Sequence, residues 1–80
     1  MTMNGHTIYA IKVYDLLIRL SPKNFIYYNN RGRCYLLLDD IELASSDFKK
    51  SIELEPDPLN NHLCYENIER LEEFLKKDEV

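Results

Sequence analysis

Apolar residues in the last third of the chain recur at the spacing of an α-helix. Cys64, Ile68, Leu71 and Leu75 are separated by four, three and four positions, which places them on one side of a helix. The other positions of this segment are crowded with charged residues, namely Glu66, Glu69, Glu72, Glu73, Lys76 and Lys77. The pattern predicts a helix over residues 58–77 with one apolar side and a solvent-facing back.

Capping and helix-breaking residues divide the rest of the chain into three more predicted helices, over residues 8–20, 25–38 and 41–54. Ser21-Pro22 and Glu55-Pro56 mark helix ends, because proline disfavours helical geometry in the residue before it. Pro58 suits the first position of the last helix. Each predicted helix is preceded by a side-chain oxygen that can accept from a free backbone N–H, carried by Thr7, Asn24, Asp40 and Asp57.

Small and large residues alternate in the two middle helices in a way that favours a close helix crossing. Gly32 lies between Tyr28 and Tyr35, and Ala44 precedes Phe48 by four positions. A glycine inside a helix costs about 1 kcal/mol relative to alanine. A close contact with a second helix is the natural compensation.

These spacings, followed by Pro56, resemble the tetratricopeptide repeat, a pair of antiparallel helices of about 34 residues. Arg31 departs from the family pattern, which usually has leucine at that position. One period earlier the chain again has a small residue, an aromatic residue and a proline. The packing positions that the resemblance implies are therefore Ala10, Tyr14, Pro22, Tyr28, Gly32, Tyr35, Ala44, Phe48 and Pro56.

The resemblance implies an all-α fold, an antiparallel helix-turn-helix solenoid of four helices in a single domain over residues 1–80. Residues 8–22 are expected to be the second helix of a truncated repeat. Residues 25–58 are expected to form a complete repeat, and residues 59–77 a polar capping helix that closes the array.

The first predicted helix is apolar around most of its circumference. Five of its positions are apolar where the residues one period later are polar, which indicates burial on more than one side. We expect this helix to pack against a second copy of the chain in a two-fold dimer, through Ile8, Ile11, Val13, Leu16 and Leu17. Two alternatives stay open. The last helix or the N-terminal residues cover this face, or a different protein does so, as for a small chaperone or an immunity-type protein.

In the family, the first helices of successive repeats line a groove that binds extended peptides or partner helices. The resemblance places this groove at Ile26, Asn29, Asn30, Arg33, Leu37, Asn60, Leu63, Cys64 and Asn67. Asparagine offers a donor and an acceptor to a peptide main chain, and arginine can hold a carboxylate. Some members grip the acidic C-terminus of chaperones with a clamp of lysines, asparagines and an arginine. Ile26, Asn60 and Cys64 stand at such positions, so this clamp is not expected here.

Composition and charge bear on the class of protein. The chain has 80 residues, of which 45% are hydrophobic and 30% charged, as in ordinary soluble domains. No apolar run approaches the roughly 20 residues of a membrane span, and the N-terminus has no signal-peptide layout. We therefore expect a cytoplasmic protein that does not bind membranes.

Charge is spread unevenly along the chain. Residues 1–37 hold five basic residues and one acidic residue, for a net +4, and residues 38–80 hold five basic and thirteen acidic residues, for a net −8. No basic cluster with interleaved aromatic residues favours nucleic-acid binding. A small regulatory or nucleic-acid-associated protein stays an alternative from another functional class.

No combination of residues points to catalysis. The sequence has no glycine-rich phosphate loop, no histidine near a nucleophile and no metal-ligand spacing. Cys34 and Cys64 are expected to be buried thiols and not a disulfide. We expect no enzymatic activity, no cofactor and no metal, and a function in non-catalytic protein–protein interaction, as an adaptor or scaffold.

Overall fold

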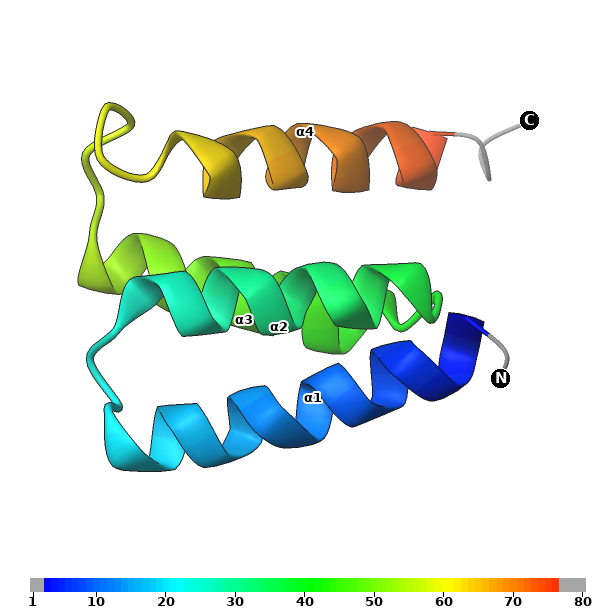
Figure 1. Ribbon diagram of the computed structural model, residues 1–80. Helices are drawn as coiled ribbons and strands as arrows, with labels where there is room; N and C mark the ends of the chain where they lie inside the picture. The colour runs from blue at the N-terminus through cyan, green and yellow to red at the C-terminus, as the bar shows by residue number, and fades with distance from the viewer. Residues whose placement is uncertain (1–2, 77–80) are drawn as a thin grey trace.

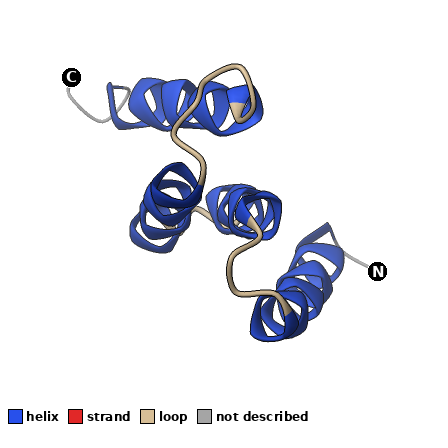
Figure 2. Cartoon of the chain, turned by 90° about the vertical axis from the view of Figure 1, so that its left-hand side faces the viewer, coloured by secondary structure: helices blue, strands red, loops and turns tan. Residues whose placement is uncertain are grey.

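The computed structural model describes residues 3–76, which form four helices joined by short connections (Figure 1). They are α1 (Met3–Leu20), α2 (Phe25–Leu37), α3 (Ile41–Leu54) and α4 (His62–Lys76). Within this described part there is no strand. Seen end-on, α2 lies between α1 on one side and α3 and α4 on the other (Figure 2). The predicted all-α helical solenoid is confirmed.

Local capping accounts for the limits of α2 and α3. The Asn24 side chain accepts a hydrogen bond from the Ile26 N–H at 3.0 Å, and Asp40 accepts from the Leu43 N–H at 3.3 Å. Asp39, between these helices, has a positive φ of 60°, a conformation that aspartate tolerates better than most residues. Both predicted caps are confirmed, and α3 has the predicted limits.

The predicted starts of the other two helices are wrong. Thr7 lies inside α1, which begins at Met3. Asp57 does not cap α4, which begins at His62. The Asp57 carboxylate instead accepts from the Leu59 N–H at 3.0 Å, and its carbonyl accepts from the N–H groups of Asn60 and Asn61. These bonds close a separate turn before the helix.

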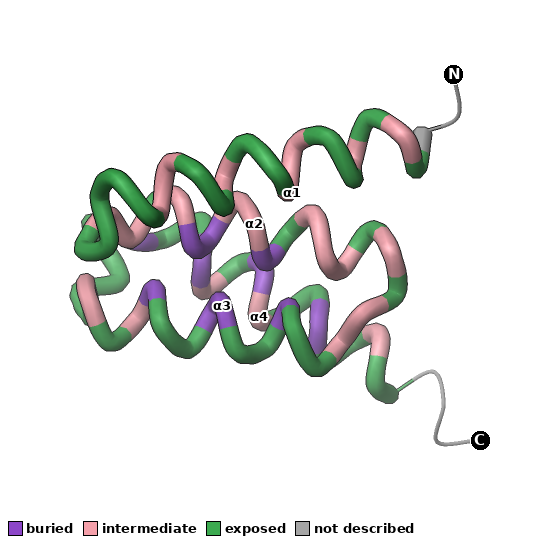
Figure 3. The backbone as a smooth tube through the Cα atoms, turned by 90° about the horizontal axis from the view of Figure 1, so that it is seen from below, coloured by how far each residue is buried: buried purple, intermediate pink, exposed green. Residues whose placement is uncertain are grey.

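The core lies where α2, α3 and α4 meet. Ala44, Phe48, Cys64 and Leu71 are buried together, whereas Leu75, predicted to share their stripe on α4, is exposed. Figure 3 shows this concentration of buried residues and the lack of any on the described part of α1. The first helix is therefore the least buried of the four.

Gly32 allows α2 and α3 to cross closely. A Cβ atom built on Gly32 would lie 2.7 Å from Cε1 and 2.9 Å from Cδ1 of the Phe48 ring, and 3.1 Å from Cβ of Asp47. All three distances are closer than ordinary van der Waals contact. The crossing predicted from the Gly32 and Phe48 spacing is therefore present.

Two tyrosines tie their helices to the preceding prolines. The Tyr28 hydroxyl donates to the Pro22 carbonyl at 2.8 Å, and the Tyr65 hydroxyl donates to the Pro56 carbonyl at 2.7 Å. Both proline residues are exposed. Among the other predicted packing residues, Ala10, Tyr14 and Tyr35 are half-buried, and the Tyr14 ring lies 6.5 Å from that of Tyr27.

Candidate protein-binding surfaces

A small hollow lies between the first turns of α2 and the start of α4. Its volume is about 150 Å³. It is lined by apolar side chains and by four asparagines, as Phe25, Ile26, Asn29, Asn30, Asn60, Asn61, His62 and Leu63. Asparagine amides beside apolar side chains suit an extended peptide, because they can bond to its main chain while the apolar groups contact its side chains.

Five of the nine predicted groove residues line this hollow, namely Ile26, Asn29, Asn30, Asn60 and Leu63. Arg33 and Leu37 are exposed further along α2 and do not line it. Phe25, Asn61 and His62 line it but were not predicted. The turn at Asp57 delays the start of α4. Asn60, Asn61 and His62 therefore lie at or just before the beginning of α4, beside the first turns of α2.

Asn29 of the hollow and Asn67, which does not line it, hold α2 and α4 together. The Asn67 side-chain NH₂ donates to the side-chain oxygen Oδ1 of Asn29 at 2.9 Å, and both residues are buried. Buried polar groups are costly unless they are paired, so this bond fixes how α4 lies on α2. Asn30 and Asn60 are the more accessible amides of the set.

A third asparagine anchors the loop before α4. The Asn61 side chain is buried. Its amide donates to the Ser51 carbonyl at 3.3 Å, the Ser51 hydroxyl at 3.0 Å and the Glu55 carbonyl at 3.1 Å. The floor of the hollow is therefore attached to the end of α3.

Both cysteines are unsuited to reactive chemistry. The Cys64 thiol is buried and donates to the Phe48 carbonyl at 3.4 Å, so it belongs to the core and not to the groove. Burial raises the pKa of the Cys64 thiol. Burial also raises the pKa of Cys34, although the Arg33 charge acts to lower it. Both thiols are free and stay protonated at neutral pH, whereas the reactive form is the thiolate.

A second surface is the solvent-facing side of α1. Tyr9, Val13, Leu16 and Leu20, which we call the outer stripe, are exposed by 71%, 39%, 54% and 71%. Their spacing of four, three and four positions puts them on one face of the helix. Of the five residues predicted for self-association, Val13 and Leu16 belong to the outer stripe.

The other three predicted self-association residues lie elsewhere on α1. Ile8 is exposed at 47% but is not on the outer stripe, and Ile11 and Leu17 are half-buried. Tyr9 and Leu20 were missed, although their helical spacing from Val13 and Leu16 was visible in the sequence. α1 contacts α2 and has no contact with α4. The alternative that the last helix covers α1 is therefore wrong.

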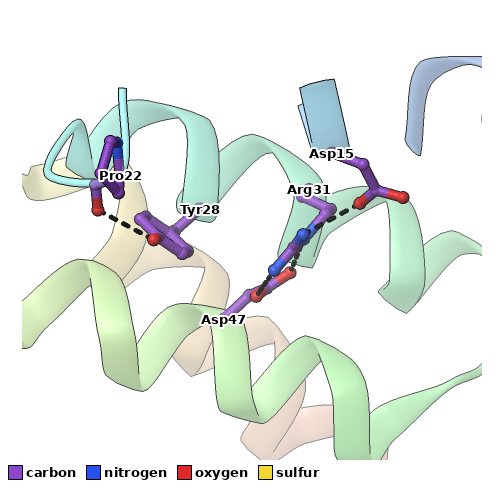
Figure 4. A network of polar contacts seen from close by, with 5 residues as sticks. All are labelled: Asp15, Pro22, Tyr28, Arg31 and Asp47. Atoms are coloured by element: carbon purple, nitrogen blue, oxygen red, sulfur yellow. Dashed lines mark hydrogen bonds and ion pairs between the residues drawn. The ribbon is translucent and has the colours of Figure 1, made fainter. Parts of the chain in front are cut away.

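An ion cluster joins three helices around Arg31 (Figure 4). Its guanidinium donates to Asp47 from Nε at 2.8 Å and from Nη2 at 2.7 Å, and to Asp15 from Nη1 at 2.9 Å. The Asp47 side chain is only 7% exposed and that of Arg31 20%. The bond to Asp47 is the main cause that raises the pKa of Arg31, against the opposing effect of burial. Three of the five N–H donors of Arg31 are taken by these two carboxylates, so the cluster holds α1, α2 and α3 together.

No helix in the part of the chain that the structure describes is long and apolar enough to cross a membrane. Residues 3–76 also hold no group of three histidine, cysteine or acidic side chains placed to bind a metal ion.

Comparison with known proteins points to one family. The family model for the tetratricopeptide repeat matches residues 25–58, the segment that contains α2 and α3. No solved structure matches significantly.

Similar curated proteins are much longer than this chain. Protein STIP1 homolog of Dictyostelium discoideum is 42% identical over 75 residues, which cover 89% of this chain and 13% of that protein. Human serine/threonine-protein phosphatase 5 is 44% identical over 46 residues, covering 58% of this chain and 9% of the phosphatase. Dynein axonemal assembly factor 4 of Pongo pygmaeus is 38% identical over 53 residues, or 66% of this chain and 13% of that protein. The chain thus spans only a small part of the length of these relatives.

The matched range and the helix pair coincide. The matched segment holds the two antiparallel helices, the glycine at their crossing and the proline that follows the second helix. This chain belongs to the tetratricopeptide repeat family, whose repeats are non-catalytic protein–protein interaction modules.

Proposed function

We propose that this protein binds an extended peptide segment of a partner protein across the hollow between α2 and α4. The main support for this proposal is that one concave site is lined by four asparagines and four other side chains, which come from two helices and a loop. The lining residues include no carboxylate, although the Glu55 carboxylate beside them accepts a hydrogen bond from the Asn60 side-chain amide at 3.1 Å. Because the hollow is only about 150 Å³, it holds one or two peptide side chains, and we expect affinity to be modest.

Replacing Asn30 by alanine tests this proposal. Peptides enriched from a displayed library of random ten-residue sequences are the probe, and isothermal calorimetry measures their affinity. We expect Asn30→Ala to weaken binding about tenfold, which is the loss of one well-made hydrogen bond. Ser46→Ala, on the exposed side of α3, is the control and leaves affinity unchanged. Equal affinity of wild type and Asn30→Ala would show that the peptides bind elsewhere.

A second candidate function is self-association through the outer stripe, as a homodimer or larger assembly. Its support is the exposure of four large apolar side chains on one face of α1. A contiguous apolar face of this kind is typical of an interaction surface. The alternative of a different protein covering α1 predicts a stoichiometric second protein in material from the native source.

Light scattering over a dilution series, at low and high salt, tests self-association. If apolar contacts dominate, we expect a mass greater than the 9.5 kDa of one chain, and we expect it to stay the same in high salt. An assembly that dissociates in high salt would assign the contact to the oppositely charged halves of the chain. A mass of one chain at all concentrations would contradict self-association.

A further inference from the structure

We propose that the self-association is head-to-tail, with α1 of one copy seated in an apolar cavity between α3 and α4 of the next. The proposal rests on the self-association proposed above and specifies its second surface. The cavity has a volume of about 320 Å³. The cavity is lined by residues of α3 and α4. They are Ser45, Phe48, Lys49, Ile52 and Glu53 of α3, and Ile68 and Leu71 of α4.

The α3–α4 junction repeats the α1–α2 junction. Ser45, Lys49 and Ile52 stand one period of about 34 residues after Ile11, Asp15 and Ile18. Ile11, Ile18 and Ile52 are all half-buried. The face of α3 that packs against α4 is thus equivalent to the face of α1 that packs against α2.

Tyrosine–proline contacts set the alignment of α4 on α2. Tyr65 bonds to the Pro56 carbonyl as Tyr28 bonds to the Pro22 carbonyl. We align α4 with α2 by placing Tyr65 on Tyr28. Ile68, three residues after Tyr65, then corresponds to Arg31, and Leu71, six residues after Tyr65, corresponds to Cys34. Ile68 and Leu71 line the cavity, so the cavity lies at the place equivalent to Arg31, which α3 reaches through Asp47.

At the first junction α3 packs on α2 beside that place and makes no contact with α1 itself. Asp47 of α3 lies against Arg31, which also holds Asp15 of α1. At the second junction no helix among residues 3–76 follows α4, and an apolar isoleucine replaces the arginine. A matching helix therefore needs an apolar residue where α3 has Asp47.

α1 meets this requirement. One period before Asp47 the chain has Val13, and one period before Lys50 it has Leu16. Both are exposed on the outer stripe, because the described chain supplies no helix to cover that side of α1. Val13 against Ile68 is thus the apolar counterpart of Asp47 against Arg31.

Charge favours this pairing over a symmetric one. The exposed cations of α1 are Lys12 and Arg19, and its only carboxylate, Asp15, is bonded to Arg31. Two α1 helices packed on each other would bring like charges together. α4 has four exposed glutamates, Glu66, Glu69, Glu72 and Glu73, against the two cations Arg70 and Lys76. The cavity lining itself carries one cation, Lys49, and one carboxylate, Glu53, so the opposite charge that guides a head-to-tail encounter comes from the glutamates of α4.

The contact between copies is looser than the one between α2 and α3. On the same alignment Glu69 takes the place of Gly32, so the two helices cannot approach as closely as at the internal crossing. We therefore expect an assembly that depends on concentration. An assembly built from head-to-tail contacts has one free binding surface at each end. It therefore continues to grow beyond two copies unless its two ends join to form a closed ring.

Two surface variants and their mixture test the arrangement. The head variant is Val13→Asp with Leu16→Lys, which copies the residues of α3. The tail variant is Ser45→Arg at the edge of the cavity, and Ser46→Arg, a neighbour outside the cavity, is its matched control. All four positions are exposed, so the variants fold, as circular dichroism checks. Sedimentation velocity measures the mass of each.

Head-to-tail contact predicts that either variant alone sediments as a single chain. Their equimolar mixture forms a dimer and nothing larger, because each pair retains one intact contact. Wild type and Ser46→Arg grow beyond a dimer as concentration rises. If Ser45→Arg alone assembles like wild type and the mixture forms no mixed dimer, the contact is between two α1 helices. That result overturns this inference and leaves self-association standing, whereas a single-chain mass for wild type overturns both.

Discussion

Replacing Asp47 by valine is expected to lower the free energy of unfolding by about 3 kcal/mol. The substitution leaves the Arg31 guanidinium largely buried without the carboxylate that takes two of its hydrogen bonds. Removing one partner of a buried ion pair typically costs 3–5 kcal/mol. We place the loss at the low end because Asp15 still binds Arg31. Urea unfolding followed by circular dichroism measures the effect.

The double variant Arg31→Leu with Asp47→Val gives the sharper result. It replaces both charges by apolar groups, and leucine is the residue that the family pattern has at position 31. Apolar replacement of a whole buried pair is often neutral or stabilising, so we expect most of the lost stability to return. Asp15→Asn is the control and costs less than 1 kcal/mol, because the Asp15 side chain is 49% exposed. A double variant less stable than Asp47→Val alone would contradict this account.

Gly32→Val is expected to destabilise the fold by about 3 kcal/mol. A Cβ at this position would lie 2.7 Å from the ring of Phe48 and 3.1 Å from Cβ of Asp47. The ring is only 1% exposed, and although it lines the cavity between α3 and α4, moving it would disturb its packing on Cys64 and Leu71. Overpacking a close contact costs about 1–3 kcal/mol and occasionally more. The two methyl groups of valine add to the clash of Cβ itself.

The matched control is Ser46→Val on the exposed side of α3. It introduces the same β-branched side chain into a helix without a neighbour to meet, so only the small difference in helix propensity remains. Equal losses at the two positions would mean that helix propensity, and not the crossing of α2 with α3, determines the result. Thermal unfolding compares the variants.

The repeat itself was predictable because its signals are local. Asn24 and Asp40 cap the helices that directly follow them, and the Gly32 and Phe48 spacing indicated the crossing. The start of α4 was not predictable from the same rule. Asp57 followed by proline is as suitable for a turn as for a helix cap, and only the anchoring of Asn61 to Ser51 and Glu55 decides between them.

The positions that form the two candidate surfaces could be predicted only in part, because they depend on how the helices are rotated against each other. The family pattern indicated which side of α2 faces the groove, but Cys64 and Asn67 are buried by the way α4 lies on α2 and α3. Asp47 is one of the five polar residues that stand one period after the apolar positions of α1, and the structure buries it. Arg31 could have indicated that Asp47 is buried. An arginine on the packing face of α2, where the family usually has leucine, needs an acidic partner on the facing helix.

The attachment of α1 to a single neighbour has a consequence for how the molecule opens. α2 contacts all three other helices, whereas α1 contacts only α2, and no residue of its described part is fully buried. Detaching α1 breaks the exposed Asp15–Arg31 bond and leaves the core of Phe48, Cys64 and Leu71 intact. Stability therefore decreases from the centre of the chain toward its beginning. Amide hydrogens of α1 exchange with solvent before those of α2 and α3, and any partner that covers α1 slows their exchange first.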